Sequence, residues 1–436
     1  MYVRTYRADT SVPPSLRRWR ASLYATFVVF GLSLASWVTR TPAIRDAVGA
    51  STAEMGLLLL GLSIGSMAGV LSSGALVQRL GCRPVAIAGC ASITLGMLAI
   101  TVGAGTGSAP AIFLGLLLFG LGMGLSEIAL NIEGAAVEKA LGRAVLPILH
   151  GCFSLGTVVG ALGGILATAV DVSPFWHLLA VTVAGLAIVA GALPGLPART
   201  GQRTTATAID PTRDAVEVPA APVAPAATML QVLRRPTVVL LGVLILGMAL
   251  AEGAANDWLP LIMVDGHGLD PTVGSLVYTG FAVAMTTGRF AGAWFLDRFG
   301  RGPVLLASVL TAAVGIAGVV FSPSPVLAGV AVLFWGLGAS LGFPVVISAA
   351  GDHPTDSAAQ VSAVATAGYI AFLVGPPLLG LLGEHHGLRN AMLAVLALVV
   401  AAALVARPAM RVPDPAPADD DHSPTDRSDD RALEAS

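Results

Sequence analysis

The chain has 436 residues, of which 55% are hydrophobic and 11% are charged, and its mean hydropathy is +0.81. Because soluble domains carry about 25% charged residues, this composition indicates a membrane protein. A formal net charge of −2 and a sequence pI of about 6.4 give no basic excess, so nucleic acid is not an expected partner.

Few residues suggest enzyme chemistry, a metal or a cofactor. Cys82, Cys90 and Cys152 have no CxxC or ligand-like spacing, so we interpret them as small buried hydrophobes, with no disulfide or metal site. No HExxH or GxxxxGK[ST] motif is present. "GLSIG" at 61–65 matches Gly-x-Ser-x-Gly but lies inside an apolar helix, where a nucleophile elbow cannot form. We therefore expect a chain that is not an enzyme.

Twelve apolar stretches are each long enough to cross a bilayer, whose core of about 30 Å needs roughly 20 residues. They lie near 21–40, 54–77, 84–103, 110–132, 145–169, 175–194, 237–262, 272–296, 303–321, 326–350, 357–382 and 388–407. Ser51 to Glu54 fits a capping box, and Ser173-Pro174 and Asp270-Pro271 each pair an N-cap with a first-turn proline. The predicted fold class is an all-α membrane protein with twelve transmembrane helices.

The basic residues predict the orientation in the membrane. With loops assigned alternately to the two sides, 20 of the 24 Lys and Arg fall on the side of the termini, three fall on the other side and Arg289 lies within a span. The positive-inside rule then places both termini in the cytoplasm of a plasma-membrane protein. Arg40, about 28 Å along the first helix, is expected to snorkel to the outer interface.

The two halves of the chain resemble each other. "GALVQRLGCRPV" at 74–85 aligns with "AWFLDRFGRGPV" at 293–304, and "LFGLGMGL" at 118–125 aligns with "FWGLGASL" at 334–341, at offsets of 219 and 216 residues. Such a repeat indicates a two-lobed transporter. We predict an N-terminal tail (1–20), a six-helix lobe (21–195), a cytoplasmic linker (196–235), a second six-helix lobe (236–408) and a disordered tail (409–436).

At this point the sequence resembles the major facilitator superfamily. That family's loop signature, Gly-x-x-x-Asp-Arg-x-Gly-Arg-Arg between the second and third helices of each half, is matched by Asp297, Arg298, Gly300 and Arg301, with Ala293 in place of the leading Gly. The first half retains Gly74, Arg79, Gly81 and Arg83 but has Gln78 in place of Asp.

The resemblance implies that this signature is a cytoplasmic gate. The Asp caps a neighbouring helix N-terminus and pairs with Arg, which holds the cytoplasmic side shut. Gln78 cannot supply the charge, so the first-half latch is expected to be weaker than the one around Asp297. The alternative is that these arginines only enforce topology.

Within the superfamily, several segments resemble the YbjJ-like branch, which is related to fucose/proton symporters. These are "WVTRTPAI", "AEGAANDW", "NIEGAAVEK" with "HGCFSLG", and "GYIAFLVGPPLLG". The resemblance covers about 21–407 and implies two lobes rocking about a midplane site.

Carboxylates inside the spans are the first candidates for proton coupling. Because a central charge costs about 2.5 to 3.5 kcal/mol, such a group normally faces a cavity or a partner. Glu127 and Asn131 are one turn apart on one face. In fucose-type symporters a Glu four residues ahead of an Asn on this helix takes part in proton coupling, and the pair here is similar. Glu133, roughly 240° around the helix, is expected to be an interface charge paired with Lys or Arg.

A second cluster lies in the seventh span, where Glu252 and Asn256 share a face and Asp257 follows. Arg289 lies roughly 12 Å inward from Asp297 and needs a counter-charge or an anionic substrate. We expect Glu252 or Asp257 as its partner, with backbone carbonyls as the alternative. Asp257 is equally compatible with a place at the outer headgroups.

Candidate cavity residues complete the site. His150 and Tyr369 occupy corresponding spans of the two lobes and are expected to line the cavity with Trp37, Asn131 and Asn256, although a membrane His or Tyr is as often a packing residue. The glycines at 156, 160, 163 and 164 resemble an antiporter signature whose proline is replaced by Ala161. Close helix packing explains them, and the repeat at 61, 65 and 69, without antiport.

The sequence thus predicts a secondary transporter of a small polar, sugar-like solute, working as a monomer by alternating access and coupled to protons. Burial of Glu127 and Glu252 would let each carry a proton when the cavity closes. The alternatives are a proton-driven drug or metabolite efflux antiporter, a passive facilitator and a non-transporting sensor. The identity of the solute and the direction of transport stay open.

Overall fold

The structure is a computed structural model that describes residues 13–142, 145–198, 200–201, 234–351 and 357–410. These residues form helices and no strand. The predicted linker and C-terminal tail fall almost entirely outside the described residues. The helices are α1 (Pro14–Thr39), α2 (Thr41–Val48), α3 (Thr52–Leu80), α4 (Cys82–Thr106), α5 (Ala109–Leu141), α6 (Leu146–Ala169), α7 (Pro174–Ala192), α9 (Pro236–Leu261), α10 (Pro271–Phe299), α11 (Arg301–Phe321), α12 (Pro325–Ala339), α13 (Gly342–Ala350), α14 (Ser357–His386) and α15 (Leu388–Ala409), with the short turns η1 (Leu193–Gly195) and η2 (Ile262–Gly266).

Eleven helical stretches of the described chain are long and apolar enough to cross a membrane. The one predicted span outside these eleven, near 272–296, is α10, which has 29 residues but contains Arg289, Asp297 and Arg298. Its length and its place in the repeat therefore identify it better than its hydropathy does. The all-α transmembrane fold class is confirmed.

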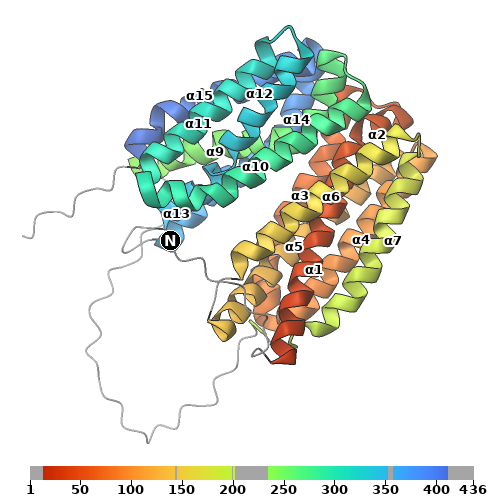
Figure 1. Cartoon of the computed structure of the whole chain (residues 1–436), viewed down its shortest axis with the longest axis vertical. Coiled ribbons are helices and arrows are strands. Elements are labelled where there is room, and N and C mark those ends of the chain that lie inside the picture. Colours follow the sequence, from red (N-terminus) through yellow and green to blue (C-terminus); the bar gives the residue numbers. More distant parts are fainter. Residues whose placement is uncertain (1–12, 143–144, 199, 202–233, 352–356, 411–436) are drawn as a thin grey trace, which may run out of the picture.

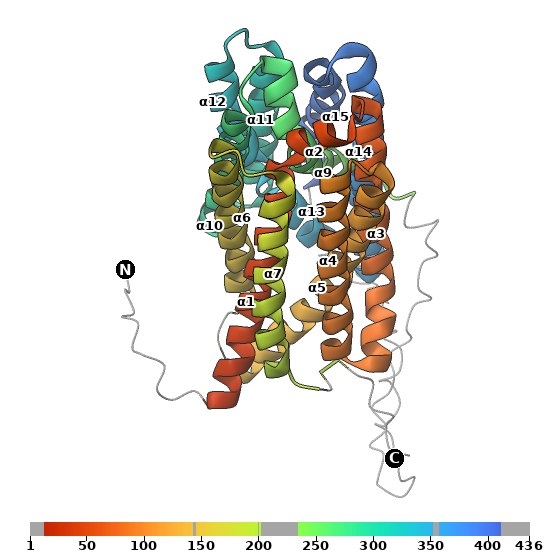
Figure 2. The same ribbon diagram turned by 90° about the vertical axis from the view of Figure 1, so that its right-hand side faces the viewer.

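The helices form two lobes, α1–α7 and α9–α15 (Figure 1). The lobes meet at the end where α2 lies, and their helices diverge toward the end where α1 begins and α15 ends (Figure 1). We call these the α2 end and the termini end. Figure 2 shows α1, α4 and α7 of the first lobe running side by side between these two ends.

Equivalent helices make equivalent contacts in the two lobes. In the first lobe α5 packs against α3 and α4, and α1 packs against α6 and α7; in the second, α12 packs against α10 and α11, and α9 packs against α14 and α15. The lobes touch each other mainly through α3 on α14 and α6 on α10. Because α3 corresponds to α10 and α6 corresponds to α14, these two contacts are equivalent, as expected for two lobes related by a pseudo-two-fold axis.

Glycines allow these helices to pack closely. A Cβ on Gly156 would lie 2.0 Å from the carbonyl oxygen of Val28, and one on Gly65 would lie 2.0 Å from that of Leu117. No side chain fits at these distances, so the small-residue repeats of α3 and α6 are required for packing, as the sequence indicated.

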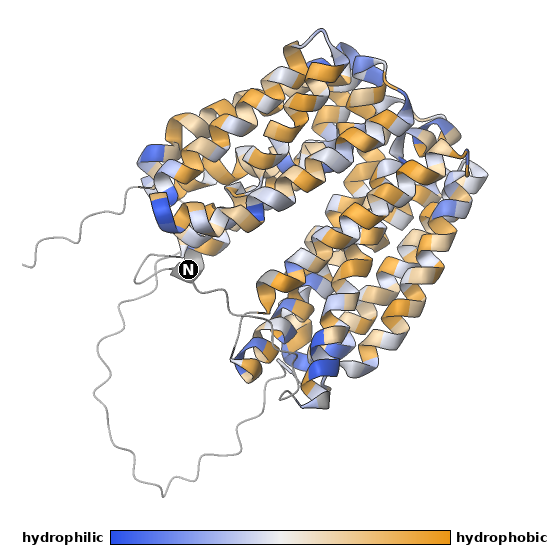
Figure 3. Ribbon diagram, viewed as in Figure 1, coloured by the Kyte–Doolittle hydropathy of each residue, from blue (hydrophilic) through white to orange (hydrophobic). Residues whose placement is uncertain are grey.

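The hydropathy pattern fits a membrane protein. Apolar residues cover the length of both lobes, whereas hydrophilic residues gather at the helix ends (Figure 3). The exposed apolar side chains include Leu71, Val326 and Leu404, which are 70%, 75% and 77% exposed. Such large exposed apolar surface is expected only where lipid is the solvent.

Several local predictions can be compared with the structure. The capping box at Ser51 and Glu54 and the Asp270 cap are confirmed, but Ser173 makes no side-chain cap. The span expected at 326–350 is broken between α12 and α13. The sequence reading also missed α2, which begins directly after Arg40 and has a proline in its first turn.

Candidate functional site

An ion pair lies inside the second lobe, halfway along its helices. The Arg289 guanidinium on α10 donates to the Glu252 carboxylate on α9 over 2.8 Å. Of the two partners expected for Arg289, the structure brings Glu252 into contact. The Arg289 side chain is 36% exposed and that of Glu252 is 16% exposed, so the pair borders accessible space rather than closed protein.

Glu127 approaches this pair from the other lobe. Its side chain is exposed, and it interacts electrostatically with both Glu252 and Arg289. An exposed carboxylate at mid-span that faces charges of the opposite lobe points between the lobes and not into lipid. Glu127 and Glu252 therefore face the same space, repelling each other while both attract Arg289.

His150 and Tyr369 lie at the same level. The exposed His150 on α6 interacts electrostatically with Arg289, and Tyr369 on α14 interacts with Glu127. Each of these interactions crosses from one lobe to the other. His150 also meets the ring of Phe27 edge-on, with 5.6 Å between centroids. Asn131, half-buried one turn from Glu127, forms no side-chain hydrogen bond with a described residue.

A second polar group lies nearer the α2 end. The Tyr278 hydroxyl donates to the amide oxygen of Asn256 over 3.3 Å, and Tyr278 interacts electrostatically with Asp257 and Glu252. Asp257 is half-buried and forms no hydrogen bond or ion pair with a described residue. Sequence reasoning missed Tyr278, although it precedes Arg289 by 11 residues, or three turns, on nearly the same face of α10.

Three expectations about individual side chains are wrong. Trp37 does not line accessible space: it is 1% exposed and lies near the α2 end, where the lobes meet. Glu133 is no interface charge, because it is fully buried beside Trp19 and Thr200 with no Lys or Arg partner among the described residues. Arg40 does not snorkel: it is 3% exposed and donates to the Thr168 hydroxyl and the Val172 carbonyl, which joins α1 to the end of α6.

The residues that the resemblance assigns to a gate lie at the termini end. Gly81 (φ 89°, ψ 166°) and Gly300 (φ 77°, ψ 166°) adopt nearly the same backbone conformation between α3 and α4 and between α10 and α11. Only glycine populates this region readily, which explains the glycine shared by the two repeats. Asp297 is exposed and forms no ion pair with a described residue, so the predicted pairing of Asp297 with an Arg is not seen among these residues. The end of α10 that carries it lies where the lobes diverge (Figure 1).

The α2 end, in contrast, is tied across the lobes. Arg45 on α2 pairs with Asp265 of η2, and the Glu384 carboxylate on α14 accepts from the backbone N–H of Ala53 over 3.1 Å. The Ser275 hydroxyl on α10 donates to the Thr39 carbonyl over 3.0 Å. We call Arg45, Asp265 and Glu384 the clasp. Sequence reasoning missed it because these residues looked like ordinary loop charges.

Loosening the clasp should open the α2 end. For Asp265→Asn combined with Glu384→Gln, we expect a loss of about 1 kcal/mol from the closed state, a roughly fivefold shift. The measurement is the rate of thiol labelling at Ser275→Cys, a fully buried position, in a chain without its native cysteines. Asp46→Asn with Glu54→Gln is the matched control, because Asp46 pairs with Arg45 and Glu54 caps α3 within one lobe. Equal labelling of the two double variants would refute the clasp.

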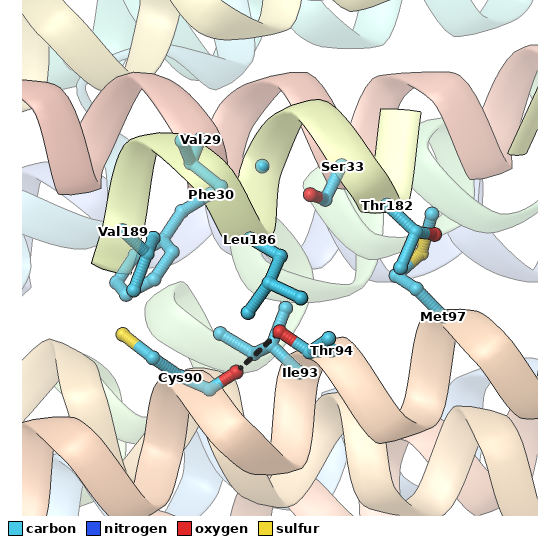
Figure 4. Close-up of a pocket in the computed structure, with 11 residues that line it drawn as sticks. Val29, Phe30, Ser33, Cys90, Ile93, Thr94, Met97, Thr182, Leu186 and Val189 are labelled. Atoms are coloured by element: carbon cyan, nitrogen blue, oxygen red, sulfur yellow. Dashed lines mark hydrogen bonds between the residues drawn. The ribbon is translucent and has the colours of Figure 1, made fainter. Parts of the chain in front are cut away.

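A separate cavity inside the first lobe does not belong to this site. It lies between α1, α4 and α7, and Ser33, Thr94 and Thr182 are its polar lining residues (Figure 4). The Thr94 hydroxyl is already bonded to the Cys90 carbonyl. With a volume of about 10 Å³, the cavity is close to the size of one water molecule. No solute binds there without rearrangement.

Comparisons with known proteins identify the family. The sequence profile of the Major Facilitator Superfamily matches residues 23–369 and 258–432. An uncharacterized MFS-type transporter of Yersinia pestis is 32% identical over 403 residues, which cover 92% of this chain and 98% of the relative. The structure resembles the nucleoside transporter NupG with a TM-score of 0.70 at 14% identity, over 91% of this chain and all of the other. It also resembles the fucose:proton symporter FucP of E. coli with a TM-score of 0.59 at 18% identity, over 90% of this chain and 98% of the other.

These likenesses extend over both lobes, and the family contains membrane transporters and not enzymes. The two solved structures show a shared fold only, since their identities are low. The profile and the relative carry the assignment: the chain belongs to the Major Facilitator Superfamily and is a multi-pass membrane transporter.

Proposed function

We propose that this protein is a proton-coupled secondary transporter of a small polar solute and that Glu127, Glu252 and Arg289 form its coupling centre. One observation carries the proposal: Glu127 of the first lobe is exposed to the space between the lobes and interacts with the Glu252–Arg289 pair of the second. Because the two lobes move against each other, protonation of a charge centre that they share can change the relative stability of the two transport conformations.

The coupling step follows from the charges. An ionised Glu127 competes with Glu252 for Arg289, whereas a protonated Glu127 leaves the pair of the second lobe undisturbed. Protonation therefore changes the electrostatic attraction between the lobes. His150 interacts with Arg289, and Tyr369 interacts with Glu127, each from the opposite lobe. We propose that these two side chains form part of the wall that binds the solute.

We propose that the termini end faces the cytoplasm, because most Lys and Arg lie on that side. The conformation is then inward-facing: the clasp holds the outer end together, and the Asp297 latch of the inner end is open. The YbjJ-like segments and the fold shared with a fucose:proton symporter support the assignment to a proton-coupled branch, and they favour symport in the plasma membrane.

Uptake into proteoliposomes tests the function. A pH gradient with the acidic side outside the vesicles is expected to drive uptake of radiolabelled fucose, uridine or glucosamine. For one proton per solute, the ratio of solute inside to outside should rise about tenfold per pH unit. A collapse of the gradient by an ionophore should abolish the accumulation. Entry that only equilibrates would identify a passive facilitator and contradict the coupling.

A further inference from the structure

One hydroxyl of the first lobe bonds to the backbone of the second lobe in the middle of the membrane. Ser63, the serine of "GLSIG" on α3, donates to the Phe372 carbonyl on α14 over 2.7 Å. A serine inside a helix commonly bonds to a carbonyl of its own helix, as Ser72 of α3 does with Ala68 over 2.7 Å. Ser63 instead bonds to the other lobe. It lies roughly 16 Å along α3 from the α2 end, close to the middle of a bilayer core of about 30 Å.

The Phe372 carbonyl is available because a proline follows it. In a regular α-helix this carbonyl accepts from the N–H of residue 376, but Pro376 has no N–H. The helix α14 nevertheless continues through Pro376 and Pro377. Because an unpaired carbonyl is costly in hydrocarbon, prolines in membrane helices are tolerated where neighbouring helices or hydroxyl side chains replace the missing donor. Here the replacement donor is Ser63, which belongs to the opposite lobe.

The turn of α14 that carries this carbonyl borders the central charges. Tyr369, three residues before Phe372, interacts electrostatically with Glu127. The Phe372 ring packs against Gly253, where a Cβ would lie 3.0 Å from the ring atom Cδ1. Gly253 directly follows Glu252 of the ion pair. The hydrogen bond between the lobes therefore holds a turn that lies beside both halves of the proposed coupling centre.

We propose that Ser63 is a positioning residue for α14: it supplies the hydrogen bond that Pro376 removes, and it thereby favours the conformation in which the α2 end is closed. When α3 and α14 separate, the Phe372 carbonyl loses this donor. Their contact continues toward the α2 end, where a Cβ on Gly56 would lie 2.8 Å from the Pro376 carbonyl oxygen. At the repeat offset of 219 residues Pro376 corresponds to Thr157 of α6, which has an N–H. The device is therefore specific to the α3–α14 side of the molecule.

A double-mutant cycle tests the proposal, with thiol labelling of the Ser275→Cys reporter as the readout. In a chain with Pro376, Ser63→Ala should raise the labelling rate roughly tenfold, because it removes a bond that is made only while the α2 end is closed. In Pro376→Ala, the new backbone N–H can pair with the Phe372 carbonyl inside α14. Addition of Ser63→Ala to that variant should therefore change the rate by less than about twofold.

Two controls match the two substitutions. Pro377→Ala leaves residue 376 without an N–H, so Ser63→Ala should keep its full effect in that variant. Ser72→Ala removes a hydroxyl that bonds within α3, and Ser63→Thr retains a hydroxyl, so both should label as slowly as the parent. Equal rates for Ser63→Ala and Ser72→Ala, or an effect of Ser63→Ala that persists in Pro376→Ala, would overturn the proposal. The labelling reports the conformational equilibrium, so its outcome is independent of whether protons drive uptake.

Discussion

Glu127→Gln is expected to abolish pH-gradient-driven accumulation in proteoliposomes while solute exchange at equal pH continues. Glutamine keeps the shape and polarity of the side chain but can neither carry a proton nor attract Arg289. The coupling energy is about 1.4 kcal/mol for each pH unit and proton, so its loss reduces the accumulation ratio about tenfold per unit. The measurement is radiolabelled solute uptake with and without the gradient.

Glu133→Gln is the matched control for this experiment. Glu133 lies six residues further along the same helix, but it is fully buried beside Trp19 and Thr200 and does not share the electrostatic partners of Glu127. It should keep gradient-driven uptake. Full accumulation by Glu127→Gln would place the coupling proton elsewhere, and Asp257, with no ion-pair partner among the described residues, would be the next carboxylate to replace.

The sequence predicted much of the fold because membrane spans are local features. Each stretch of roughly 20 apolar residues identifies a helix without reference to any other helix. The failures occur where a helix departs from that rule. The span of α10 was predicted from its apolar stretch although it contains Arg289, whereas α2 was missed because eight residues with mixed polarity resemble a loop.

The candidate site was predictable in its members but not in its pairing. A carboxylate in a span is conspicuous, so Glu127, Glu252 and Asp257 could be named from their positions. The choice of Glu252 as partner of Arg289 depends on how α9 rotates against α10, which no single helix encodes. Trp37 and Glu133 were misplaced for a related reason: helical spacing shows which residues share a face but not which helix covers that face.

Replacing Gly56 by leucine should trap the protein with its α2 end open. A Cβ on Gly56 would lie 2.8 Å from the Pro376 carbonyl oxygen and 3.0 Å from the Gly380 Cα, and these atoms belong to α14 of the other lobe. Backbone at this distance cannot give way as a flexible side chain can. Overpacking costs about 1 to 3 kcal/mol, and here the cost arises only in the conformation in which α3 and α14 touch.

Such a penalty shifts a two-state equilibrium by roughly 5- to 150-fold. We therefore expect faster labelling of the buried Ser275→Cys reporter and a loss of transport, because the cycle must pass through the closed state. Gly191→Leu is the control, since a Cβ there meets no atom within 4 Å. If Gly56→Leu labels no faster than Gly191→Leu, the contact between α3 and α14 persists through the cycle. A transport motion in which the two lobes separate at the α2 end would then be excluded.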